Sequence, residues 1–400
     1  MKQRSPLMRR VLKKELASLA DVCLNITDPW GSYGTAGNAS DREAAVLKAG
    51  LTISSPEFYR KLLRDGELGV ADAYIDGVWD TDDLVNVFRI FIRSDAANDQ
   101  VNKRVSIIKR LARAIQTWRR QNSVSGSKRN IHEHYDLGND FFQLFLDESL
   151  NYSCLEFEND SSTLEEAANL KMDNICQQLS LQRNDHLIEI GTGWGGMACF
   201  AAKNYGCKVT TTTISTEQFN HVKEKIKTES LEGLVFPVNS DYRHLDGKYD
   251  KLLSVEMIEA VGEKFLPQYF SVCDRLLKPG GKGLIQAILI REQIFEKYRR
   301  GTDFIREFVF PGSFLPSNRL ILQTIERNTN LQLLNYRDIT EHYVKTLAIW
   351  RERFHSNRTD IQRLGFDERF MRLWDYYLAY CIAGFAERRC NDAQLTFLKL

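Results

Sequence analysis

Residues 187–196 read LIEIGTGWGG. The first four residues are typical of a short buried strand, the glycines that follow form a turn, and residues 197–204 have the composition of a helix. Glycines are needed at such a strand-to-helix turn because the backbone adopts unusual dihedrals and a ligand approaches the main chain closely. The stretch therefore predicts a nucleotide-like ligand at the end of a strand.

Strand and helix patterns continue to alternate after this turn. Residues 209–214 are rich in β-branched side chains and precede a helical pattern at 217–228. Residues 252–255 and 284–290 are further candidates for buried strands, the latter after a turn signal at Lys278-Pro279-Gly280-Gly281. This alternation predicts a doubly wound α/β domain.

Two kinds of ligand fit the glycine pattern. Gly191, Gly193 and Gly196 fit the G-x-G-x-x-G fingerprint of sites for NAD or FAD. Such sites place an acid at the end of the second strand for the ribose, but residues 211–215 read TTTIS. Glu189 instead completes the E-x-G-x-G-x-G pattern of S-adenosylmethionine methyltransferases. The loop favours S-adenosylmethionine, with a dinucleotide as the alternative.

Composition excludes several classes of protein. The chain has 400 residues, of which 43% are hydrophobic and 27% charged, as in globular proteins. Its longest apolar run, residues 376–383, is far shorter than the about 20 residues that span a bilayer. The eight cysteines form no metal-binding pattern, so no metal site is expected, and they indicate reduced thiols in the cytoplasm.

Positive charge is concentrated in two segments. Residues 1–14 carry six Lys or Arg and no acid, and residues 101–129 carry nine and no acid. Apolar residues recur at spacings of three and four within 101–121, which predicts a basic amphipathic helix. The small polar residues at 123–129 indicate a linker after an N-terminal domain, 1–122. Such charge indicates an anionic partner: phospholipid is favoured over nucleic acid, because no nucleic-acid-binding motif occurs. The alternative is that the apolar side of this helix packs on the following domain and its charges are only solvated.

Several stretches resemble the cyclopropane-fatty-acyl-phospholipid synthases and the related mycolic acid methyltransferases. These are HYDLGNDFF at 134–142, NYSC at 151–154, SVEMIEAVG at 254–262 and FPGSFLPS at 310–317. Upstream, GELGVADAYIDGVW at 66–79 resembles the N-terminal domain of the members that act on phospholipids.

The resemblance implies a Rossmann-like class I S-adenosylmethionine-dependent methyltransferase domain at 130–400, preceded by a smaller lipid-binding domain. The implied reaction transfers the methyl of S-adenosylmethionine to a cis double bond of an unsaturated phospholipid acyl chain. A carbocation forms, and loss of a proton closes a cyclopropane ring. The resemblance also implies a homodimer, bound peripherally to anionic lipids at the inner face of the cytoplasmic membrane.

The resemblance implies that a bound bicarbonate ion removes this proton. Its ligands would be the main-chain N–H of Cys154, the carboxyl of Glu259, the hydroxyl of Tyr343 and the main chain of Ile288. Gln286 stands where the family commonly has a histidine, and glutamine cannot carry a charge or shuttle a proton. A methyl- or methylene-branched acyl chain is therefore the alternative product.

The residues that the resemblance assigns to S-adenosylmethionine surround the glycine loop. They are Tyr152, Ser153, Gly191, Gly193, Thr213, Ile214, Gln218, Tyr242 and Arg243.

Overall fold

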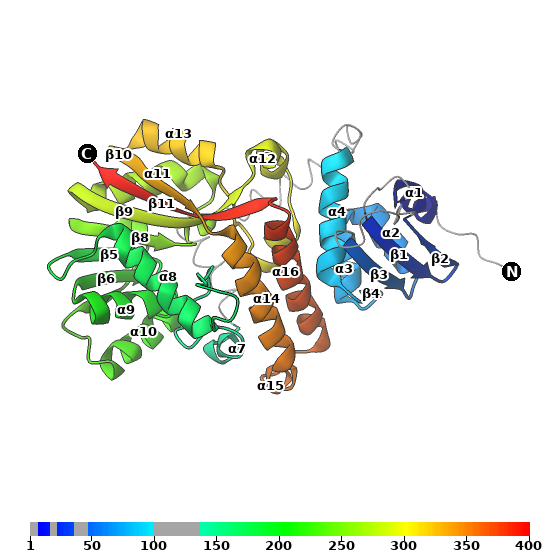
Figure 1. The fold of residues 1–400 in the computed structure, drawn as a ribbon, viewed down its shortest axis with the longest axis horizontal. Helices are drawn as coiled ribbons and strands as arrows, with labels where there is room; N and C mark the ends of the chain where they lie inside the picture. The colour runs from blue at the N-terminus through cyan, green and yellow to red at the C-terminus, as the bar shows by residue number, and fades with distance from the viewer. Residues whose placement is uncertain (1–6, 17–21, 36–46, 99–136) are drawn as a thin grey trace.

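The chain forms two β-sheets, one in the N-terminal quarter and one in the remainder (Figure 1). The computed structural model describes residues 7–16, 22–35, 47–98 and 137–400. The basic helix expected at 101–121 and the linker at 123–129 lie outside the described residues and stay predictions, as do the domain boundaries that depend on them.

The larger sheet has the strand order β10-β11-β9-β8-β5-β6-β7. The strands from β7 to β9 are parallel, whereas β11 runs antiparallel to both β9 and β10. The strands are β5 (His186–Ile190), β6 (Lys208–Thr213), β7 (Val235–Asn239), β8 (Tyr249–Val255), β9 (Leu277–Ile290), β10 (Leu331–Asp338) and β11 (Cys390–Lys399). The doubly wound α/β domain expected from the sequence is confirmed.

Helices and short helical turns connect these strands. The helices are α7 (Asn139–Gln143), α8 (Leu164–Leu179), α9 (Gly196–Tyr205), α10 (Thr216–Thr228), α11 (Leu266–Leu276), α12 (Glu292–Arg300), α13 (Asn318–Asn328), α14 (Thr340–Ser356), α15 (Arg358–Arg363) and α16 (Glu368–Ala386). The turns are η1 (Tyr242–His244), η2 (Ile258–Ala260), η3 (Glu263–Phe265) and η4 (Ile305–Val309).

The four strands expected from the sequence and the helices expected at 197–204 and 217–228 are all present. One local expectation is wrong. Residues 278–281 belong to β9 instead of forming a separate turn before it. The chain bends within the strand, because Gly280 has φ +77° and the pairing of β8 with β9 shifts register nearby.

The smaller sheet has the order β2-β1-β3-β4. Its strands are β1 (Val22–Asp28), β2 (Gly31–Gly34), β3 (Leu47–Ile53) and β4 (Trp79–Thr81), and its helices are α1 (Leu7–Leu16), α2 (Glu57–Asp65), α3 (Glu67–Ile75) and α4 (Leu84–Asn98). Residues of β1 and β3 alternate between buried and more exposed positions, as in a sheet with one face on a core.

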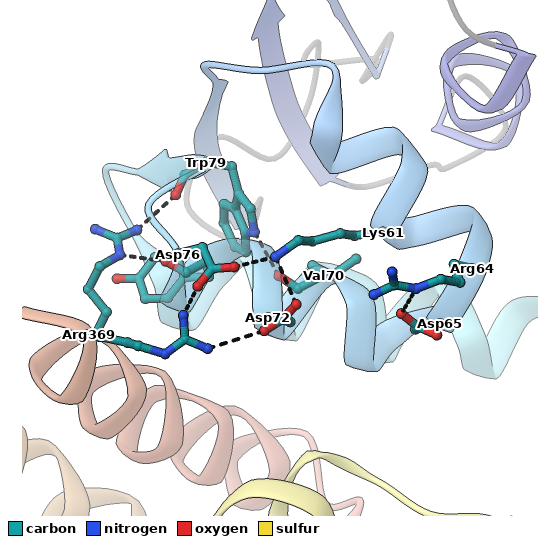
Figure 2. A network of polar contacts seen from close by, with 10 residues as sticks. Lys61, Arg64, Asp65, Val70, Asp72, Asp76, Trp79 and Arg369 are labelled. Atoms are coloured by element: carbon teal, nitrogen blue, oxygen red, sulfur yellow. Dashed lines mark hydrogen bonds and ion pairs between the residues drawn. The ribbon is translucent and has the colours of Figure 1, made fainter.

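The two parts of the chain meet where α4 and α3 pack against α16 (Figure 1). Figure 2 shows the polar side of this contact, in which Arg369 of α16 reaches Asp72 of α3 and Asp76, which directly follows α3. Both carboxylates also pair with Lys61 of α2, and the distance from the Lys61 Nζ to Asp72 is 2.8 Å. This network places α2 and α3 against the end of α16.

Arg372 of α16 makes a second set of contacts with the N-terminal region. Its guanidinium donates to the carbonyl oxygens of Tyr74, at 2.5 Å, and Trp79, at 2.8 Å. It also lies 4.0 Å from the centre of the Tyr74 ring, while the Tyr74 hydroxyl donates to Asp375. The side chain of Arg372 is only 16% exposed, so solvent screens these contacts weakly.

We expect Arg372→Ala to lower the free energy of unfolding by about 2 kcal/mol, because two charge-assisted hydrogen bonds and a cation–π contact are lost together. Arg363→Ala is the control, since that side chain is 74% exposed and pairs only within its own helix, so it should cost less than about 0.5 kcal/mol. Urea denaturation of both variants measures the difference. Equal losses would contradict a structural role for the Arg372 contacts.

Candidate functional site

The glycine loop connects β5 to α9 and is held against β6. The N–H groups of Gly191 and Thr192 donate to the carbonyl oxygen of Thr212, at 3.1 and 2.9 Å. Gly191 has φ +99°, which favours glycine. At Gly196 a Cβ atom would lie 2.7 Å from the carbonyl oxygen of Ser149, so the start of α9 packs too closely for any side chain. The local geometry thus requires the glycines that the sequence presents.

A cavity of about 890 Å³ opens beside this loop. All nine residues that the resemblance assigns to S-adenosylmethionine line it: Tyr152, Ser153, Gly191, Gly193, Thr213, Ile214, Gln218, Tyr242 and Arg243. The structure thus brings these residues together from the segment before α8, the glycine loop, the end of β6 and η1.

The polar groups beyond β6 are paired with one another. The Thr213 hydroxyl donates to the side-chain oxygen of Gln218 at 2.8 Å. Asp241, which is buried, accepts hydrogen bonds from the guanidinium of Arg243. Burial alone would raise the pKa of Asp241, but the hydrogen bonds and charge of Arg243 outweigh it and hold that pKa below its usual range. Asp241 is therefore ionised at neutral pH.

Cys154 contributes to the site through its main-chain N–H, while its thiol is buried. Burial raises the pKa of the thiol well above its usual value, which keeps it protonated. Its N–H donates to Oε1 of Glu256 at 2.7 Å. Cys154 is thus unsuited to act as a nucleophile.

Glu256 is the centre of a hydrogen-bond network at one end of the cavity. Besides the N–H of Cys154, its Oε1 accepts a hydrogen bond from Nε2 of Gln286 at 2.8 Å. Its Oε2 accepts one from the hydroxyl of Tyr343 at 2.7 Å. The residue has φ +45°, a rare conformation for a side chain of this kind. Glu256 lines the cavity together with Tyr343.

Glu259 and Asp392 are buried close to Glu256. Glu259 accepts the N–H of Ile288 at 2.5 Å through Oε1, and its Oε2 has no hydrogen-bond partner among the described residues. Burial, followed by the charge of Glu256, raises the pKa of Glu259 to about 8. Asp392 accepts a hydrogen bond from Nε2 of Gln286 at 3.1 Å, and burial together with the two glutamates raises its pKa strongly. The raised pKa values favour the neutral form of both carboxyls.

Lys171 supplies positive charge behind this network. It lies on the buried face of α8, is 1% exposed, and donates to the hydroxyl of Ser153. Burial raises the pKa of Glu256 above its usual value, and the charge of Lys171 and the three donated hydrogen bonds limit that rise. The ammonium group is thus a nearby counter-charge for one ionised carboxylate.

The residues assigned to a bicarbonate site do gather at this end, but they are already engaged. Cys154 and Tyr343 donate to Glu256, and Ile288 donates to Glu259. Gln286 is fully buried and lies behind the cavity wall. The sequence analysis assigned no role to Glu256, Asp392 or Lys171. The available signals were an acid at the end of β8, next to the glycine-loop strand, and a lysine on an otherwise apolar helix face.

The raised pKa of Glu259 predicts a pH dependence of stability. The folded state keeps this proton up to about pH 8, whereas the unfolded state loses it near pH 4.5, so the stabilisation is complete below pH 4.5 and is lost as pH rises toward 8. In the wild type, Glu259 should make the free energy of unfolding fall by up to about 1.4 kcal/mol for each pH unit between pH 4.5 and 8. We expect Glu259→Gln to remove this contribution to the slope. Urea denaturation at pH 5, 6, 7 and 8 measures the slope. Glu341→Gln, at a carboxyl that is 90% exposed, is the control and should keep the wild-type slope.

Known proteins resemble this chain over most of its length. Residues 122–395 match the family described as mycolic acid cyclopropane synthetase. Tuberculostearic acid methyltransferase UfaA1 of Mycobacterium tuberculosis is 34% identical over 376 residues, which cover 92% of this chain and 86% of that protein. The cyclopropane-fatty-acyl-phospholipid synthase of Escherichia coli is 35% identical over 352 residues, covering 87% of this chain and 86% of that protein.

The fold agrees with these similarities. The crystal structure of mycolic acid cyclopropane synthase CmaA1, complexed with SAH and CTAB, aligns with a TM-score of 0.64 and 30% identity, covering 68% of this chain and 98% of that chain. Because the family match, the two relatives and the class I methyltransferase fold agree, this chain belongs to the S-adenosylmethionine-dependent family of cyclopropane fatty acid and mycolic acid cyclopropane synthases.

Proposed function

We propose that this protein transfers the methyl group of S-adenosylmethionine to the cis double bond of an unsaturated phospholipid acyl chain and forms a cyclopropane ring. The observation that carries the proposal is a single cavity that joins the glycine loop to an apolar limb and to the carboxylate of Glu256. The family supports the transfer of a methyl group to a fatty acyl chain. The ring product and the phospholipid substrate are the specific parts of the proposal.

The apolar limb of the cavity fits a hydrocarbon chain. We give this name to the part lined by Phe58, Val70, Trp79, Phe88 and Phe91, which come from α2, α3, β4 and α4. An acyl chain placed there is removed from water, at about 0.8 kcal/mol for each CH₂ group. The limb supports the proposal that the N-terminal region, residues 1–122, binds lipid.

The residues around the cavity suit the activation of an alkene. S-adenosylmethionine, when bound, supplies an electrophilic methyl group. An alkene is a weak nucleophile that no base can activate, so the protein must align it and exclude water, and alignment alone can contribute about 7–11 kcal/mol. The aromatic rings of Tyr152, Tyr343 and Tyr377 line the same cavity, and ring faces stabilise a developing cation.

Bicarbonate does not fit the donors as they are arranged here. The N–H of Cys154 and the hydroxyl of Tyr343, both expected to hold it, donate instead to the carboxylate of Glu256. A second anion beside that carboxylate would meet a like charge in a buried site, which is strongly unfavourable. We therefore derive no step through bicarbonate.

A methyl-branched product is the second candidate. The relative UfaA1, 34% identical, is named a tuberculostearic acid methyltransferase. The same carbocation gives a methylene-branched chain if a 1,2-hydride shift moves the positive charge to the carbon that bears the new methyl group and that methyl then loses a proton. A separate reductant would then be needed to give a methyl branch.

Location and assembly remain proposals. Among the described helices, none combines the length and the apolar character required to cross a bilayer. The basic segment 101–129 is the feature that favours binding to anionic phospholipid, at about 1 kcal/mol for each Lys or Arg near the surface. We retain peripheral binding at the inner face of the cytoplasmic membrane, and a homodimer, as proposals.

We expect the purified protein to move label from methyl-labelled S-adenosylmethionine into vesicles of phosphatidylglycerol with cis-monounsaturated chains. Mass spectrometry should find acyl chains that are one CH₂ heavier, and fragmentation distinguishes a ring from a methylene branch. Vesicles with saturated chains are the control and should stay unlabelled, because they lack the nucleophile. Unlabelled unsaturated lipid would contradict the proposed function, and a branched product would replace its ring-forming step.

Gly193→Asn should weaken the binding of S-adenosylmethionine at least tenfold, or about 1.4 kcal/mol. Gly193 lines the cavity with φ +52° and open space beside it, so asparagine tolerates the backbone conformation while its side chain fills the ligand space. Isothermal titration calorimetry measures the dissociation constant. Gly233→Asn, at an exposed glycine with the same open surroundings, is the control and should bind like the wild type. Equal affinities for both variants would contradict the assignment of the cofactor to this loop.

A further inference from the structure

We infer that Glu256 is the base of the reaction: its carboxylate removes the proton from the transferred methyl group of the lipid carbocation. The inference rests on the proposed function and makes its proton-transfer step specific. It assigns to a side chain of this protein the task that the resemblance gives to a bound bicarbonate.

The first support is the set of donors around Glu256. The N–H of Cys154 and the hydroxyl of Tyr343 are two of the groups expected to hold the carbonate species, and they hold this carboxylate at 2.7 Å each. Gln286 adds a third hydrogen bond at 2.8 Å. The carboxylate of Glu256 thus occupies the position that the resemblance gives to a bound oxyanion. It belongs to the residue that directly follows β8.

The second support is the distribution of charge among the three buried carboxyls. Glu256 accepts three hydrogen bonds, whereas Glu259 accepts one and has an unpartnered oxygen. Asp392 shares the amide of Gln286 with Glu256. Hydrogen bonds to the charged form favour ionisation, and the ammonium of Lys171 favours it further. Burial raises the pKa of all three carboxyls, but three hydrogen bonds oppose that rise at Glu256, so the donors assign the negative charge to Glu256.

The third support is that one oxygen of the Glu256 carboxylate can still accept a proton. Each carboxylate oxygen has about two positions for accepting protons or hydrogen bonds. On Glu256, Oε1 uses both, for Cys154 and Gln286, whereas Oε2 uses one, for Tyr343. The remaining position on Oε2 is the one available to receive a proton.

The position of Glu256 at the end of β8 brings it to the glycine loop. A Cβ atom on Gly191 would touch the side chain of Met257, the next residue, at 3.2 Å, and Glu256 and Gly191 line the same cavity. The backbone of Glu256 lies at φ +45°, and such strain persists where a function and the surrounding contacts maintain it.

The step balances as follows. A C–H bond of the transferred methyl breaks, and its electron pair forms the second ring bond to the cationic carbon. The proton passes to Oε2 of Glu256, which becomes a neutral carboxylic acid. The products are the cyclopropane, S-adenosylhomocysteine and one proton, which reaches water when the lipid leaves.

The test combines removal of the base with chemical rescue. Glu256→Gly suits the positive φ and vacates the donors of Cys154 and Tyr343. We expect turnover to fall at least 100-fold, the usual contribution of a positioned base, while the dissociation constant for S-adenosylmethionine stays within threefold. Adding bicarbonate should restore at least a tenth of wild-type turnover in this variant, because a small oxyanion fits the vacated site.

Glu256→Gln separates loss of the base from loss of volume. The amide keeps the shape of the side chain but cannot accept the proton, and it fills the space that bicarbonate would need. We expect turnover as low as in Glu256→Gly, with no response to bicarbonate. Calorimetric binding of S-adenosylmethionine verifies that each variant is folded.

The wild-type protein gives the decisive comparison. In buffer freed of carbon dioxide its turnover should stay within 20% of the value with added bicarbonate. A loss of activity that bicarbonate reverses in the wild type would overturn the inference, as would Glu256→Gly retaining more than half of wild-type turnover. Failure of the wild type to label lipid at all would instead contradict the proposed function, so the two failures are distinguishable.

Discussion

Three carboxyl groups, those of Glu256, Glu259 and Asp392, are buried close together, and burial and mutual repulsion oppose more than one negative charge among them. Two carboxylates at this range cannot both ionise without a counter-charge for each, and among the described residues Lys171 is the buried cation that acts on the network. The network therefore has a single ionised member. Its identity follows from the donors, which are concentrated on Glu256.

The limit on negative charge in this network explains why an uncharged glutamine suits position 286. By sequence alone, Gln286 is a weakened replacement for a histidine that would assist an anion. In the structure its Nε2 donates to both Glu256 and Asp392, while its Oε1 accepts from Gln394 at 3.2 Å. A neutral amide connects an ionised and a neutral carboxyl without adding a charge. A residue that cannot titrate is thus well matched to a site in which the carboxylate itself is the anion.

The sequence predicts the parts of this protein that depend on neighbouring residues. Strand 187–190, the glycine turn and the following helix are local, because burial, β-propensity and glycine dihedrals act within a few positions. Glu256 was missed for the opposite reason. Its donors come from positions 154, 286 and 343, which lie 102, 30 and 87 residues away. Neither these contacts nor the positive φ can be deduced from spacing. The error at residues 278–281 is of the same kind, since β8 pairs with Leu277 before this turn signal and with Lys282 after it, which includes the signal within one long strand as a bulge.

In the proposed reaction, the choice between a cyclopropane and a branched acyl chain then depends on the position of Oε2 of Glu256. The carbocation can lose a proton from the transferred methyl at once, which closes the ring, or only after a 1,2-hydride shift, which gives the methylene branch, and a base already directed at the methyl C–H bond favours the first. A diffusing ion could adapt to either, whereas Glu256 is attached to β8 and its Oε1 is fixed by two donors. The position of the acyl chain is fixed in turn by the apolar limb, whose walls from α3 and α4 depend on their contact with α16. If the proposed function and base are correct, product identity depends on the docking of the N-terminal region, which positions the acyl chain, together with the network around Glu256, which positions the base.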